Sequence, residues 1–110
     1  MMRARRRMLW NGAVTASVVL NRDGALCAVP TVSQTGISDA EAATDYIASA
    51  SIAIEDALTA MGRRDRREDK AVEDITGQTL RRVARSMFGL RPIVHVHILR
   101  LSGDDLAGVA

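Results

Sequence analysis

The sequence predicts an α+β domain in which a three-stranded sheet carries two helices on one face, in the order β-β-α-α-β. A period of two, with Val14, Ala16, Val18 and Leu20 on one face, marks a strand near the start of the chain, over Ala13–Leu20. Two later stretches repeat apolar residues at spacings of three and four, which is typical of amphipathic helices. A run rich in β-branched residues, Ile93–Leu101, completes the pattern as a third strand. The 110 residues are the size of one domain, so we assign residues 1–110 to a single domain.

The first strand is followed by turn residues and then by a second strand. Every second side chain of Ala13–Leu20 is apolar, so one face of this strand is expected to be buried. Asn21–Gly24 has the composition of a turn, because Asn, Asp and Gly tolerate left-handed backbone. A second strand is predicted from Ala25 to about Thr35. Pro30 lies inside it, and since proline cannot donate a ladder hydrogen bond, we expect an edge strand or a break there.

Two helices are expected to follow. The first begins at Ser38, which has the spacing of a capping box with Glu41, and runs to about Met61. The second begins after a charged connector near Asp69, an acidic residue suited to a helix N-terminus. Gly77 lies inside this second helix, where glycine costs about 1 kcal/mol relative to alanine but permits close approach of another element. The apolar stripes are Ile47, Ala50, Ile54, Leu58 and Met61 in the first helix, and Val72, Ile75, Thr79, Val83 and Met87 in the second.

The last strand carries apolar side chains on both of its faces, whereas a sheet exposed on one side normally shows one polar face. Helices on one side would leave the opposite sheet face open. We therefore expect this open face to be an interface, through which the chain forms a homo-oligomer or packs on a neighbouring domain. The predicted interface residues are Ile93, His95, His97 and Leu99.

Composition is that of a soluble globular domain, with 47% hydrophobic and 25% charged residues. Cys27 is the only cysteine, which fits a reducing compartment. The basic residues 1–7 and the tail 102–110 are expected to be flexible. Asn11 and Gly12 interrupt the apolar stretch that follows the basic start, so we do not assign a secretory signal. No run of about 20 apolar residues is present, and we predict a cytoplasmic protein without membrane contact.

Catalytic and metal-binding signatures are weak. His95 and His97 would point the same way on a strand and could reach one metal ion. A metal site needs a third or fourth ligand, and no Asp, Glu or Cys lies close by in sequence, so we assign no metal and no cofactor. Cys27 has no adjacent base, and neither a G-x-S-x-G elbow nor a phosphate loop occurs. The chain by itself is therefore predicted not to be an enzyme.

Arginine clusters point to a polyanionic partner, because guanidinium groups neutralise phosphates. The alternative interpretation is a solvated helix face paired with Asp74 and Gln78. No aromatic platform for stacking bases is evident, which argues against a dedicated single-strand binder. A small-molecule-sensing domain is a further alternative, although the sequence offers no convergent polar set for it. The residues predicted to contact RNA or a catalytic core are Arg81, Arg82 and Arg85 in the second helix, and Arg5, Arg6 and Arg7 at the start.

An ordered set of short segments resembles the C-terminal domain of ribonuclease J. Together these segments cover roughly Arg5 to Leu101, which is nearly the whole chain. They are Arg5–Leu9 at the entry, Val14–Leu20 followed by Asp23-Gly24, Pro30–Val32 with Gly36, and Arg91–Val94 running into Val96–Ile98.

The resemblance implies a role in RNA degradation. In this family the domain follows a metallo-β-lactamase core with an inserted β-CASP domain, which acts as a 5′-to-3′ exonuclease and an endonuclease with bound zinc or similar divalent ions. That activity serves mRNA decay and rRNA maturation, and the C-terminal domain supports dimer assembly and full activity. None of the core's metal ligands has a match in this chain. We therefore expect a non-catalytic accessory domain whose partners are a second copy, the catalytic core and RNA; the alternative is a free-standing, weak RNA-binding module that uses the arginine clusters.

Overall fold

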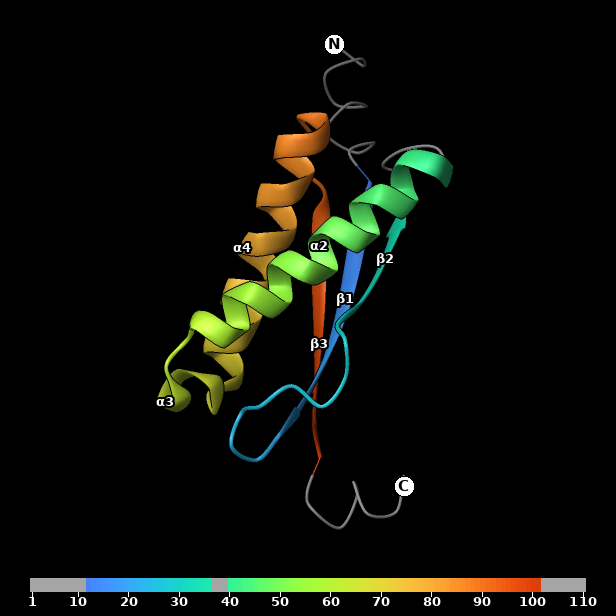
Figure 1. Ribbon diagram of the computed structural model, residues 1–110. Helices are drawn as coiled ribbons and strands as arrows, with labels where there is room; N and C mark the ends of the chain where they lie inside the picture. Colours follow the sequence, from blue (N-terminus) through green and yellow to red (C-terminus); the bar gives the residue numbers. More distant parts are fainter. Residues whose placement is uncertain (1–11, 37–39, 102–110) are drawn as a thin grey trace.

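A computed structural model describes residues 12–36 and 40–101 of the chain (Figure 1). Over this described part the α+β class is confirmed, with helices on one face of a three-stranded sheet. The order there is β-β-α-α-α-β, because the charged connector contains a short additional helix. The segments predicted to be flexible, 1–7 and 102–110, and the predicted cap at Ser38 lie outside the described residues. The elements are β1 (Ala13–Asn21), β2 (Thr31–Thr35), α2 (Ala40–Ala60), α3 (Arg63–Arg66), α4 (Asp69–Phe88) and β3 (Ile93–Leu101).

Strand β1 lies in the centre of the sheet, between β2 and β3. It pairs antiparallel with β2. It pairs parallel with β3 along its whole length, from Ala13 beside Ile93 to Asn21 beside Leu101. A parallel pair needs a long crossover connection, which the helices supply here. The sheet is therefore mixed, and within the described residues β2 and β3 are its two edges.

The second strand is shorter than the sequence predicted. It begins at Thr31, directly after Pro30, and not at Ala25. Proline has no backbone N–H to donate. In the segment between β1 and Pro30, the bridge of Leu26 to Leu20 of β1 is isolated and does not extend into a ladder. The predicted break at Pro30 is thus confirmed, and the segment before it is a loop.

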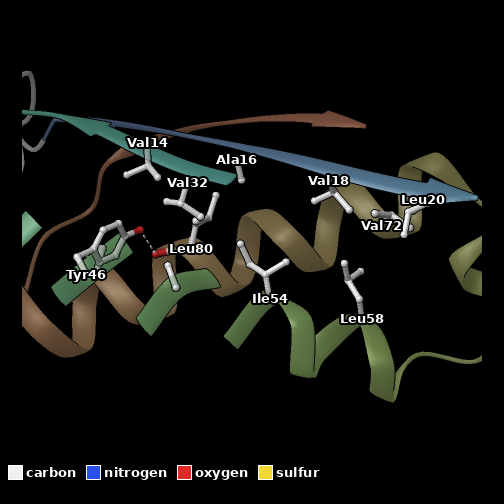
Figure 2. Packing of buried hydrophobic residues seen from close by; sticks show 12 residues of the cluster. Val14, Ala16, Val18, Leu20, Val32, Tyr46, Ile54, Leu58, Val72 and Leu80 are labelled. Carbon is white, nitrogen blue, oxygen red and sulfur yellow. Dashed lines mark hydrogen bonds between the residues drawn. The ribbon is translucent and has the colours of Figure 1, made fainter. Parts of the chain in front are cut away.

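The core lies between the sheet and the helices, where the alternating side chains of β1 point (Figure 2). Val14, Ala16, Val18 and Leu20 are all fully buried, as their alternation predicted. Burying a side chain the size of valine or leucine stabilises the fold by about 1.5–3 kcal/mol, so β1 contributes a large share of the stability of the folded state. The helices contribute Tyr46, Ala50, Ile54 and Leu58 from α2, and Val72, Leu80 and Ala84 from α4.

The buried stripe of α4 differs from the predicted one at its C-terminal end. Met87 was expected in the stripe, but it is 38% exposed. The buried line continues at a spacing of four from Val72 through Thr76 and Leu80 to Ala84. The prediction favoured large apolar residues, whereas close packing of α4 on α2 and β3 also accommodates small ones.

Charge and close packing tie the turn after β1 to α3. The carboxylate of Asp23 forms ion pairs with Arg63 and Arg67, each at 3.2 Å. Hydrogen bonds from Arg63 and then Arg67 hold the pKa of Asp23 below its usual value. Gly24 has φ +90°, and a Cβ at this position would lie 2.5 Å from the Cβ of Arg66. A side chain here would therefore strain the backbone and collide with α3.

Alanine substitutions at Gly24 and at Gly77 should have opposite effects on stability. Gly24→Ala should lower the free energy of unfolding by about 2 kcal/mol or more, because of strain and collision. Gly77→Ala should raise it by up to about 1 kcal/mol through helix propensity, since its Cβ would meet no atom closer than 3.8 Å outside its own helix. Urea unfolding of both variants measures the two changes; changes of the same sign would contradict this description of the packing.

A buried tyrosine links the two long helices. The hydroxyl of Tyr46 donates a hydrogen bond to the carbonyl oxygen of Leu80 at 3.0 Å, shown as a dashed line in Figure 2. The ring lies near Phe88, with 5.9 Å between the ring centroids. Burial of the hydroxyl raises the pKa of Tyr46 to about 12. The folded state therefore favours the neutral phenol.

Replacing this hydroxyl should lower stability in a pH-dependent way. Tyr46→Phe should reduce the free energy of unfolding by about 1 kcal/mol at neutral pH, because one buried hydrogen bond is lost. Tyrosine in the unfolded chain ionises near pH 10, so the wild-type protein should lose about 1 kcal/mol of this contribution by pH 11. Urea unfolding of both proteins at pH 7, 9 and 11 checks this. If the stability advantage of the wild type over Tyr46→Phe grew above pH 10, the predicted direction of the pH effect would be wrong.

Candidate interaction surfaces

The sheet face opposite the helices is set by the alternation along β3. Val94, Val96 and Ile98 pack against the core on the helix side. The residues between them point to the opposite side and are exposed, and Ile93 and Leu99 each expose 56% of their surface. We call this side the open face. All four predicted interface residues lie on it: Ile93, His95, His97 and Leu99.

The middle of the open face is polar, which the prediction did not include. His95 lies beside Thr15 of β1, and His97 lies beside Ser17. Strand β2 continues the two rows with hydroxyl side chains, those of Ser33 and Thr31 respectively. The open face is thus a band of imidazoles and hydroxyls with exposed apolar side chains at either end of β3. Hydroxyl and imidazole groups can be buried in a contact when they find hydrogen-bond partners.

The histidine pair offers two possible metal ligands on one face of one strand. Structural zinc sites use four protein ligands and catalytic sites three. Within residues 12–36 and 40–101, no group of three or more His, Cys, Asp or Glu side chains could hold a metal ion. The space between sheet and helices, where a small-molecule sensor would hold its ligand, contains the packed core.

The predicted arginines of α4 come together in one groove of about 550 Å³. Arg81, Arg82 and Arg85 are exposed and form no ion pair with any described residue. Asp74, considered above as their partner, instead pairs with Lys70 at 3.3 Å. The predicted N-terminal arginines, Arg5, Arg6 and Arg7, lie outside the described residues. The groove is lined by Gln78, Arg81, Arg82, Arg85, Leu90, Arg91 and Pro92.

Arg91 is a member of this groove that sequence reasoning missed. It follows α4 and belongs to no cluster in the sequence. Gly89 ends the helix in a left-handed conformation, with its N–H bonded to the carbonyl oxygen of Arg85 at 2.9 Å. This reversal, followed by the buried Pro92, carries Arg91 back to the groove. The glycine at the helix end was the available signal, because such a cap turns the chain sharply.

These features define the class of protein as a small α+β domain with one open sheet face and one arginine-lined groove. Within residues 12–36 and 40–101, no helix qualifies as a membrane span. The chain belongs to the ribonuclease J C-terminal domain family, whose model matches residues 1–101. This match over nearly the whole chain confirms the resemblance carried by the ordered segments. A search of curated proteins gave no match.

Proposed function

We propose that the chain is a non-catalytic accessory domain that assembles a metal-dependent ribonuclease by self-association. Membership of the ribonuclease J C-terminal domain family supports this role. In it, the domain would bring together catalytic cores that hold the divalent metal ions and degrade RNA. The domain's own contribution would be the contact between copies, and through it the activity of the assembled enzyme in mRNA decay and rRNA maturation.

One observation carries this proposal. Ile93 and Leu99 each leave 56% of their surface exposed on a sheet face that no described element covers. Full burial of such a side chain is worth about 1.5–3 kcal/mol, so covering both rewards association. The hydroxyls and imidazoles between them can supply hydrogen bonds that fix the orientation of the contact.

Charges on the open face should abolish self-association. We expect the wild-type domain to have the mass of a dimer or larger species by light scattering after size exclusion. Ile93→Lys/Leu99→Lys should shift the mass to a monomer, because burying two unpaired ammonium groups is costly. Val29→Lys/Ile52→Lys is the matched control, since these residues are 69% and 62% exposed in a loop and on α2. A double lysine variant on the open face that keeps the wild-type mass would refute this role for the face.

The arginine groove supports a second candidate function, weak RNA binding. Four arginines line one groove, and three of them have no ion-pair partner among the described residues. Guanidinium groups placed in this way can bind consecutive phosphates of a single strand. The binding would be independent of sequence, because phosphate contacts carry no base information.

RNA affinity, measured by fluorescence anisotropy with a short 5′-phosphorylated RNA, should depend on salt and on the groove. If about three phosphates are neutralised, raising salt from 50 to 200 mM should weaken binding by roughly 20-fold. Arg81→Ala/Arg82→Ala/Arg85→Ala should abolish most of the affinity at low salt. The control is Arg63→Ala/Arg67→Ala, because these exposed arginines already pair with Asp23. Equal losses in both variants, or no binding at low salt, would exclude the groove as an RNA site.

A further inference from the structure

The outer edge of β3 is unpaired within the described chain, because β1 lies on its other side. The N–H of Ile93 donates to the carbonyl oxygen of Gly12, which continues into β1, at 2.9 Å. Backbone groups alternate in direction along a strand, so the odd-numbered residues of β3 bond to β1. The N–H and C=O groups that point outward are therefore those of Val94, Val96, Ile98 and Arg100.

Within its own sequence, β3 lacks the features that normally protect an edge strand from pairing. Natural edges are short, carry proline, lysine, bulges or inward-pointing charges, or are covered by a helix or loop. The opposite edge, β2, follows this rule, with five residues that begin directly after Pro30. Strand β3 has nine residues, and its one charged side chain, Arg100, is already paired with Asp69 at 2.9 Å. The two edges of the sheet therefore differ in length and in the features that oppose pairing.

The edge of β3 borders a groove that charged side chains of α4, those of Glu73, Asp74 and Arg81, also line. The groove, of about 350 Å³, runs between β3 and α4, and Val94, His95, Val96 and His97 form its strand side. Gly77 of α4 also lines the groove, where α4 comes close to the side chain of Val94.

We propose that β3 pairs antiparallel with β3 of a second copy, about a two-fold axis at His97. This inference rests on the self-association proposed above and gives it a geometry. The two sheets become one continuous sheet in the order β2-β1-β3-β3-β1-β2. The two open faces then lie side by side on one sheet. The pairing covers Ile93 and Leu99 in part, with Leu101 and His95 of the second copy beside them.

The sequence of β3 matches itself in this register. An axis at His97 aligns all nine residues, and any other axis leaves strand ends unpaired. Val96 then lies opposite Ile98 of the second copy as a hydrogen-bonded pair, which agrees with the outward direction of both backbones. On the open face, Ile93 meets Leu101 and His95 meets Leu99 of the second copy. No like charges face each other along the strands, since Arg100 lies opposite Val94, so charge repulsion does not oppose the pairing.

Disulfide trapping tests the register directly. In a background with Cys27→Ala, His97→Cys places one new thiol on the axis, in a non-hydrogen-bonded pair with Cα atoms about 4.5 Å apart. That separation lies within the disulfide range of about 4.4–6.8 Å. The control is His95→Cys on the same face, whose two copies would lie roughly 14 Å apart along the strands. Mild oxidation should give at least about ten-fold more covalent dimer with His97→Cys than with His95→Cys.

A second pair of variants tests the edge without cysteines. Val96→Pro removes an outward N–H that takes no part in the bond to β1, and proline is tolerated at such edge positions. Val96→Ala loses the same packing but keeps the N–H. We expect Val96→Pro to raise the dimer dissociation constant at least about ten-fold above that of Val96→Ala, with both variants folded by circular dichroism.

The outcomes separate this inference from the proposed function. A dimer by light scattering that cross-links equally at both cysteine positions, or withstands Val96→Pro, overturns the edge pairing and leaves self-association intact. A wild-type chain that stays monomeric at all concentrations overturns both. Selective cross-linking at His97→Cys together with dissociation by Val96→Pro supports the pairing.

Discussion

The architecture depends on one constraint: the described helices cover only one face of the sheet. β1 turns four fully buried side chains toward α2 and α4, and its opposite side chains remain half-buried. The same division continues into β3, where Val94, Val96 and Ile98 close the core and Ile93 and Leu99 face outward. The packed core and the open face are therefore two sides of the same strands.

Local patterns in the sequence predicted much of this fold. The alternation in β1 and the apolar run of β3 fixed both strands within one residue of the observed bounds, because a period of two is a direct consequence of strand geometry. The position of Pro30 indicated the break before β2. The parallel pairing of β1 with β3 was not predicted, since strand direction depends on the path of the connecting helices. The helix α3 was not predicted, because its residues, Arg63–Arg66, have no apolar periodicity.

The candidate surfaces were predicted in part for similar reasons. Alternation along β3 put His95 and His97 on the side of Ile93 and Leu99, and the structure places them there. Their hydroxyl neighbours come from β1 and β2, so only strand register could reveal the polar band. The groove joins three arginines of one helix, which spacing predicts, with Arg91 beyond the turn, which spacing does not.

The central claim is that copies of this domain associate along β3, and amide hydrogen exchange as a function of protein concentration tests it most directly. The amides of His95, His97 and Leu99 should be protected at every concentration, because they bond to β1. The outward amides of Val94, Val96, Ile98 and Arg100 should exchange quickly in dilute protein and slow in step with dimer formation. Outward amides that exchange equally fast in monomer and dimer would contradict the claim.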